Sequence, residues 1–209
     1  MEIINLFPGS YASNCYLLLS DGHAAIVDPS PRLARMQSEL ESRGVTLDFI
    51  LLTHGHFDHV LSLDELRDLT GVPAYIHEKD AEMLPDSDKN GFSYFFSREK
   101  CFREAEKTFA DGDELVLGNE TIRVVHTPGH TRGSSCFLLE ESGALLTGDT
   151  LFDGNIGRYD LYGGDRETIF ASLRAMRNLP RDLTIYPGHG GTVRLGDALD
   201  AVLPTLNDW

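Results

Sequence analysis

Residues 53–59 read Thr-His-Gly-His-Phe-Asp-His, and they directly follow an apolar run at 49–52. The apolar run predicts a short buried strand that ends in this cluster. His54 and His56 are two residues apart, so both rings would point to the same side of a strand end. Asp58 and His59 would begin the next helix, where an aspartate can also act as an N-cap. Four such side chains within six residues nevertheless predict metal ligands.

Three further donors lie far downstream, each next to a glycine. His130 and His189 follow Pro-Gly pairs, and Asp149 follows Gly148. A closed structural zinc site needs four ligands and is usually built with cysteine, so five histidines and two aspartates exceed that requirement. The set predicts two cations that share a carboxylate, with open positions for water and substrate.

Composition describes an ordinary globular protein of 209 residues, with 41% hydrophobic and 24% charged residues. We expect one domain over 1–209. The sequence has no run of about 18 apolar residues, so we expect no membrane span. The first residues lack the basic and apolar regions of a secretory signal. Cys15, Cys101 and Cys136 are odd in number and widely spaced, which predicts reduced thiols and a cytoplasmic location.

The formal net charge is −15. Such a surface repels nucleic-acid phosphates, so neither a nucleic-acid partner nor nuclease activity is expected. We expect a small-molecule substrate and no membrane partner, with the oligomeric state left open. An anionic substrate would have to be attracted locally, by the metal centre and nearby Arg or Lys side chains.

Apolar patterning and turn signals predict an α/β (α+β) chain in which two packed sheets carry helices on their outer sides. The predicted strands are 1–7, 15–19, 24–28, 49–52, 73–77, 114–117, 121–126, 135–139, 144–147 and 183–186. Helices are expected from Ser30-Pro31 to Gly44, along the stripe Val60, Leu63, Leu66 and Leu69, after an Asp165 cap, and at 196–203. The irregular segment 85–106 contains an aromatic run at 92–102, which could be a pocket wall or lid, a core plug or an oligomer contact.

The signature His54-x-His56-x-Asp58-His59, followed by His130, Asp149 and His189, resembles the metallo-β-lactamase-fold hydrolases. The stretches 148–152, 157–160 and 163–165 are similar to the glyoxalase II-like (hydroxyacylglutathione hydrolase-like) branch. The resemblance implies a four-layer αβ/βα sandwich of two mixed β-sheets flanked by helices. We expect the chain to be most similar to the short, single-domain members of this branch. The full-length enzymes have a glutathione-binding helical domain that we do not expect in the residues after His189.

The same resemblance divides the seven donors between two divalent metal ions bridged by Asp149. One ion is held by His54, His56 and His130, and the other by Asp58, His59 and His189. Imidazole and carboxylate ligands suit zinc first, with iron or manganese as alternatives.

Two cations can lower the pKa of a shared water to near neutrality and so provide a hydroxide nucleophile. Asp58 is the predicted catalytic residue, which orients that nucleophile and takes its proton. A thiolate, with a conjugate-acid pKa of roughly 8.5, leaves without a general acid. The predicted activity is therefore hydrolysis of a small thioester, such as hydroxyacylglutathione. Alternatives are lactone or ester hydrolysis, and a persulfide dioxygenase with one iron on His54, His130 and Asp149.

Other polar and aromatic residues are candidates for supporting or substrate-contacting roles. Asp28 and Thr53 could hold ligand imidazoles by their other nitrogen, although Asp28 could equally be a turn residue. Arg158 and Asp160 would form a structural pair or touch substrate. The candidate pocket residues, for which ordinary packing is the alternative, are Phe57, Phe152, Asn155, Tyr159 and Tyr162. Structural roles are expected for His23, His77 and His126.

Overall fold

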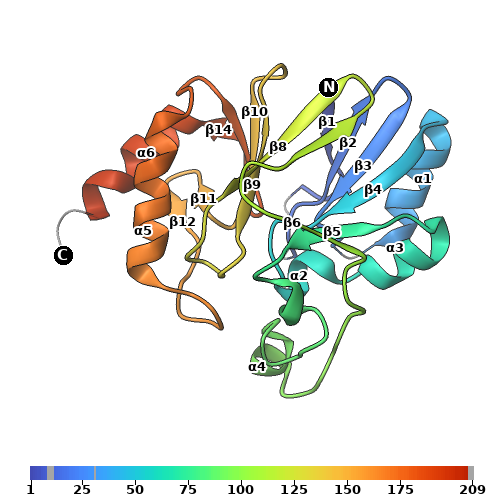
Figure 1. The fold of residues 1–209 in the computed structure, drawn as a ribbon, viewed down its shortest axis with the longest axis horizontal. Helices are drawn as coiled ribbons and strands as arrows, with labels where there is room; N and C mark the ends of the chain where they lie inside the picture. Colours follow the sequence, from blue (N-terminus) through green and yellow to red (C-terminus); the bar gives the residue numbers. More distant parts are fainter. Residues whose placement is uncertain (9–11, 31, 207–209) are drawn as a thin grey trace.

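The computed structural model describes residues 1–8, 12–30 and 32–206. Two six-stranded sheets pack against each other in the middle of the molecule, and helices cover their outer faces (Figure 1). The predicted arrangement of two packed, mixed sheets with helices outside is therefore confirmed.

The first sheet has the strand order β1-β2-β3-β4-β5-β6. Its first three strands are antiparallel, and β3 to β6 run parallel to one another. Its strands are β1 (Glu2–Asn5), β2 (Tyr16–Ser20), β3 (His23–Val27), β4 (Thr46–Leu51), β5 (Ala74–His77) and β6 (Lys107–Phe109).

The second sheet has the order β14-β13-β10-β9-β8-β7, in which only the β10–β13 pair is parallel. Its strands are β7 (Glu114–Leu117), β8 (Glu120–His126), β9 (Ser135–Leu139), β10 (Ala144–Gly148), β13 (Thr184–Pro187) and β14 (Val193–Arg194). A small hairpin of β11 (Leu151–Phe152) and β12 (Asn155–Ile156) follows β10.

The strands form because apolar side chains alternate between two buried environments. On β2, Leu17 belongs to the outer cluster beneath the helices, while Leu18 belongs to the cluster between the sheets. Leu145 and Leu146 of β10 divide in the same way. Full burial of each leucine contributes roughly 1.5–3 kcal/mol, so a one-residue slip in pairing would exchange both environments and is strongly disfavoured.

Two helices cover each outer face. The helices α1 (Leu33–Arg43) and α3 (Leu63–Thr70) flank the first sheet, and α5 (Arg166–Ala175) and α6 (Leu195–Val202) flank the second (Figure 1). Gly44 ends α1 with φ 61°, as predicted. The Asp165 carboxylate accepts a hydrogen bond from the Thr168 amide at 2.8 Å, which confirms the predicted N-cap of α5.

The helix predicted after the histidine cluster is wrong in two respects. It is divided into α2 (Phe57–Val60) and α3, with a break at Leu61 and Ser62. Leu69 lies at the solvent-facing edge of the predicted stripe and is 47% exposed, because the last turn of α3 extends past the core. In the predicted irregular segment, α4 (Phe92–Phe96) forms a short helix.

The predicted N-cap at Ser30 is also wrong. The Ser30 hydroxyl donates instead to the carbonyl oxygen of Ser13 at 2.9 Å, and α1 begins at Leu33. Pro31, the predicted first helical position, lies outside the described residues. Ser30 therefore connects two loops rather than starting a helix.

The topology brings three strand ends to one edge of the sandwich. β4 ends just before the histidine cluster, β10 ends at Gly148, and β13 ends at Pro187. Parallel strands in the same sheet end on the same side, so Asp149 and His189 leave β10 and β13 together. No helix in the described part of the chain has the length and apolarity needed to cross a bilayer.

Candidate metal centre

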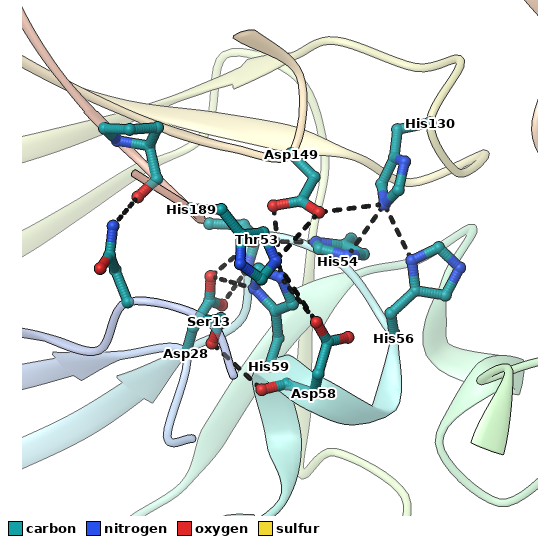
Figure 2. A network of polar contacts seen from close by, with 12 residues as sticks. Ser13, Asp28, Thr53, His54, His56, Asp58, His59, His130, Asp149 and His189 are labelled. Atoms are coloured by element: carbon teal, nitrogen blue, oxygen red, sulfur yellow. Dashed lines mark hydrogen bonds and ion pairs between the residues drawn. The ribbon is translucent and has the colours of Figure 1, made fainter. Parts of the chain in front are cut away.

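All seven predicted donors meet at this edge, between the two sheets (Figure 2). Three overlapping groups each bring their ligand atoms within 4.8 Å of one another. These groups are His54 with His56 and His130, His54 with His59 and Asp149, and Asp58 with His59 and His189. The fold therefore gathers side chains that are up to 135 positions apart in the chain.

The first group consists of three buried imidazoles with facing nitrogens. Nε2 of His130 lies 2.8 Å from Nδ1 of His56 and 3.2 Å from Nε2 of His54. His54 and His56 come from the loop after β4, and His130 from the loop between β8 and β9. The three nitrogens converge on one point from both sheets.

The second group lies beside the first and is more open to solvent. Nε2 of His189 lies 3.3 Å from Oδ2 of Asp58. Asp149 stands between the groups, with one carboxylate oxygen 3.3 Å from Nε2 of His59 and the other 3.7 Å from Nε2 of His130. A carboxylate in this position can serve two cations.

The outer nitrogens of three histidines have hydrogen-bond partners, which assign their tautomers. Nδ1 of His59 donates to Oδ2 of Asp28 at 2.8 Å. The Thr53 hydroxyl donates to the same carboxylate at 2.7 Å, so it accepts from Nδ1 of His54 at 3.0 Å. Nδ1 of His130 donates to the carbonyl oxygen of Arg158 at 2.6 Å. Each of these rings therefore presents a lone pair on Nε2 to the centre.

The local charges favour cations at this point. Burial and the neighbouring imidazoles of His59 and His130 hold the pKa of His54 well below its usual range. Burial together with His130 lowers the pKa of His56 to about 3. Burial alone would raise the pKa of Asp149, but the facing histidines, His59 foremost, hold it well below its usual range. Neutral imidazoles next to ionised carboxylates are the protonation states that metal ligation requires.

His59 differs from the other histidines. Burial would lower its pKa, but the carboxylates of Asp149, Asp28 and Asp58 raise the pKa well above its ordinary value. A positive charge at His59 is therefore favourable, and a metal cation at Nε2 would supply it. Nε2 of His59 and Oδ1 of Asp149 are also buried without a hydrogen-bond partner among the described residues. The donor set fits divalent metal ions on these grounds.

Two glycines allow the backbone to approach the centre closely. Gly188 packs against Asp149, so that a Cβ atom there would overlap Oδ1 of Asp149 and come within 2.7 Å of Cε1 of His59. Gly148 adopts φ 47°, which turns the chain sharply from β10 into Asp149.

One buried carboxylate that the sequence did not single out joins the two loops that carry the first group. Asp80 accepts from the amides of Gly55 and Gly133, at 3.2 and 2.6 Å, and from the Thr131 hydroxyl at 2.6 Å. Burial raises the pKa of Asp80 to about 6. In sequence, Asp80 resembles a surface acid in a charged turn, so only the folded contacts identify it.

The loop before β2 also supports the centre without any sequence signal. The Asn14 side-chain amide donates to the carbonyl oxygens of Pro187 and Gly190, at 2.8 and 3.0 Å, on either side of His189. The Ser13 hydroxyl donates to the carbonyl oxygen of Asp58 at 3.1 Å (Figure 2). These contacts fix the backbone on either side of His189 and at Asp58, two members of the second group.

A cavity of about 730 Å³ opens beside the donors. Of the residues predicted to line a pocket or touch substrate, Phe57, Phe152, Asn155 and Arg158 line it. The remaining members of the wall include Leu61, Phe95, Phe96 and Leu161. The aromatic run thus contributes to a pocket wall, while Phe92 and Phe102 are buried.

Three predicted pocket or substrate residues lie outside this wall. The Tyr159 ring packs against Phe170, with centroids 6.2 Å apart. Asp160 pairs with the Arg158 guanidinium at 2.7 Å, and the Tyr162 hydroxyl donates to Glu82 at 2.8 Å. These three side chains make their contacts outside the cavity, although Arg158 and Leu161 of the same loop line it. The remaining histidines also lie apart from the donor set: His77 stacks on His126, and His23 pairs with Asp48.

Comparison with known proteins identifies the architecture. The family model of the metallo-beta-lactamase superfamily matches residues 8–189. Hydroxyacylglutathione hydrolase GloC of Haemophilus influenzae is 33% identical over 190 residues, covering 90% of each chain. The crystal structure of the BLEG-1 B3 metallo-beta-lactamase is similar with a TM-score of 0.89 at 33% identity, covering 99% of this chain and 100% of that one. TTHA1623 in a di-iron-bound form gives a TM-score of 0.81 at 29% identity, covering 94% and 96%. The predicted four-layer fold is confirmed.

Proposed function

This chain belongs to the metallo-beta-lactamase superfamily, and on that premise we propose that it is a dinuclear metal-dependent hydrolase of a small thioester. The observation that carries the proposal is the position of Asp149 between two groups of donors, with one oxygen toward His59 and the other toward His130. The likeness to a hydroxyacylglutathione hydrolase supports thioester cleavage in particular. The proposed domain is the whole chain, 1–209.

The grouping of the donors supports the assignment of ligands that the family resemblance implies. One ion would be held by His54, His56 and His130, and the other by Asp58, His59 and His189, with Asp149 shared. Bound ions supply Lewis acidity, which polarises a carbonyl and lowers the pKa of water toward neutrality. Zinc suits these ligands, and the di-iron-bound relative supports iron as the alternative.

Asp58 is the proposed catalytic carboxylate. Its side chain is 26% exposed and lines the cavity, so a water molecule and the substrate can both reach it. Burial opposes ionisation, but His59 and His189 hold the pKa of Asp58 below its usual range. An ionised carboxylate at this point can orient a water molecule and accept its proton.

The leaving group follows from the side chains of the cavity. Among the described residues that line it there is no Lys, Tyr, Cys or Glu, and Asn155 and Arg158 are the polar groups outside the donor set. A leaving group must then depart without a dedicated side-chain acid. A thiolate does so readily, because its conjugate acid has a pKa of roughly 8.5. This supports a thioester over an amide.

Three rival activities share the same centre. Lactones and oxygen esters could enter the same cavity. The similarity to the BLEG-1 structure suggests β-lactam hydrolysis as another alternative. An amide nitrogen, however, needs a proton when it leaves. A persulfide dioxygenase would use one iron on His54, His130 and Asp149 and would consume oxygen.

The test begins with metal quantification of the purified protein and then a panel of thioester, lactone, β-lactam and persulfide substrates. We expect two metal equivalents and thioester hydrolysis without oxygen uptake. Asp149→Ala should lose metal and activity, whereas Asp153→Ala, an exposed acid in the hairpin turn, should retain both. One iron with oxygen uptake would replace the proposal with the dioxygenase, and full turnover by Asp149→Ala would contradict the shared ligand.

A further inference from the structure

Outside the donor set, the wall of the cavity is mostly apolar, and four of its side chains are phenylalanine rings. α4 contributes Phe95 and Phe96, which are 48% and 50% exposed yet lie along the cavity beside the metal donors. Phe57 and Leu61, from the α2 region, continue this wall, and Phe152 lies by His189, with ring centroids 6.1 Å apart. A bound molecule would therefore meet rings on its way to the donors.

These rings hold one another in place before any ligand binds. Phe57 packs against Phe92, Phe95 and Phe96 with ring centroids 5.4, 5.6 and 5.5 Å apart. Phe92 is buried, so it anchors α4 while its neighbours stay exposed. Such edge-to-face and tilted pairs are favourable arrangements for aromatic rings. The wall is thus preformed, and binding an apolar group to it requires little ordering.

The side chains of the same cavity offer little to a thiol with several charged groups. Among the described lining residues outside the donor set, Arg158 is the cation. Its guanidinium is already paired with Asp160 at 2.7 and 2.8 Å, and it lies over the Phe95 ring at 5.6 Å. Glutathione carries two carboxylates and one ammonium group, while the chain as a whole carries −15. Its charged ends would find little compensation here.

An adjoining hollow shares Phe57, Leu61 and Phe96 with the cavity and carries two more cations. Both already lie against rings: Arg98 is 5.5 Å from the Phe92 centroid, and Lys100 is 5.4 Å from the Phe102 centroid. The surface that continues from the cavity is therefore also aromatic.

Building on the proposed thioesterase function, we infer that the substrate carries an apolar group, aromatic or aliphatic, next to its thioester, and that Phe95 and Phe96 of α4 select it. Removing apolar contact of this size from a pocket typically changes kcat/KM by about tenfold to a hundredfold. The selection would appear as a ratio of kcat/KM values, higher for apolar substrates than for small thioesters.

The first experiment compares substrates on the metal-loaded protein. One series holds the thiol constant as N-acetylcysteamine and varies the acyl group from acetyl to hexanoyl to phenylacetyl. A second series holds acetyl constant and varies the thiol from glutathione to benzyl mercaptan, and S-lactoylglutathione is measured beside both. We expect kcat/KM at least about tenfold higher for the apolar member of one series. The series that responds tells which side of the thioester meets the wall.

The second experiment changes the wall. Phe95→Ser should lower the ratio of kcat/KM for the preferred apolar substrate to kcat/KM for the acetyl thioester of N-acetylcysteamine about tenfold or more. Phe95→Leu loses the stacking on Arg158 but keeps apolar area. It should therefore retain most of the preference for apolar substrates. Val116→Ser, which removes an exposed apolar side chain from β7 far from the cavity wall, should leave this ratio unchanged. Melting temperatures of all variants show that the fold is intact.

The outcomes separate the two proposals. If the metal-loaded protein cleaves no thioester of either series, the proposed function fails. If it cleaves them with S-lactoylglutathione preferred, or if Phe95→Ser leaves the apolar preference unchanged, the thioesterase stands and the apolar selection is wrong. Equal losses of kcat/KM for the apolar substrate in Phe95→Ser and Phe95→Leu would assign the effect to Arg158 rather than to apolar contact. This result would also overturn the apolar selection.

Discussion

The carbonyl oxygen of Arg158 lies 2.6 Å from Nδ1 of His130 and orients that imidazole toward the donor set. The same residue extends its guanidinium toward Asp160 and the Phe95 ring. The backbone of Arg158 thus supports the centre, while its side chain belongs to the cavity wall.

This division predicts the behaviour of Arg158→Ala. The carbonyl oxygen remains, so the variant should bind the same number of metal ions as the wild type. Because the Arg158 side chain is exposed, stability should stay within about 0.5 kcal/mol. Metal analysis and thermal unfolding measure both quantities. A missing metal equivalent in Arg158→Ala would show that the side chain, and not the carbonyl, holds the His130 loop.

Gly188→Ala should disable the centre. The added methyl group would overlap the Asp149 carboxylate and crowd His59, so the donors must shift. A displacement of about 1 Å can cost a hundredfold in activity, and we expect a loss of at least that order in kcat/KM together with weaker metal binding. Gly191→Ala is the matched control, since a Cβ atom there meets nothing within 4 Å. Equal activity in the two variants would refute the steric argument.

Thr53→Val should weaken metal binding without changing any ligand. The substitution removes the hydroxyl that links Asp28 to Nδ1 of His54, so the imidazole loses its orienting partner. Loss of such a partner typically costs 10–100-fold in metal affinity, which competition with a chromophoric chelator measures. Thr53→Ser keeps the hydroxyl and should restore the affinity. The interpretation is wrong if serine and valine are equally impaired.

Asp80→Asn should change how stability depends on pH. Burial raises the pKa of Asp80 to about 6, so the folded protein holds this proton more tightly than the unfolded chain does. The contribution of Asp80 to the free energy of unfolding is therefore most favourable at low pH. This contribution is lost as the pH rises from about 4 to about 6. Asparagine does not titrate in this range. The unfolding free energy of the wild type, relative to Asp80→Asn, should fall by ~3 kcal/mol across that window.

Denaturant titrations at several pH values, with a chelator present in all samples, measure this difference. The chelator removes the separate pH dependence of metal release. A constant difference between the two proteins from pH 4 to pH 7 would mean that Asp80 is not the titrating group.

The sequence predicted the sheets well because their signals are local. The bounds of β7 and β9 agree with the predicted ranges 114–117 and 135–139. Alternating apolar residues and turn residues lie within each segment, so no knowledge of distant contacts is needed. The donors were equally visible, since His and Asp residues next to glycine-containing strand ends form a recognisable pattern.

Other features depend on contacts that exist only after folding. Ser30 has the composition of a helix cap, yet its hydroxyl binds Ser13, which lies 17 positions earlier. Asp80 and Asn14 look like surface residues until the loops they join come together. Tyr159 is a reasonable candidate for the pocket from its sequence position, but in the fold its ring packs against Phe170. Local pattern carries none of this information.

The seven donors are unevenly distributed along the chain. Four lie before residue 60, and the last is His189. A nascent polypeptide therefore presents the histidine cluster early in translation, long before its partners from the second sheet have been synthesised. An ion captured at that moment would meet at most four of the seven groups. If ions bind as proposed, all seven ligands are available only after almost the entire chain has been synthesised, because His189 is the last of them.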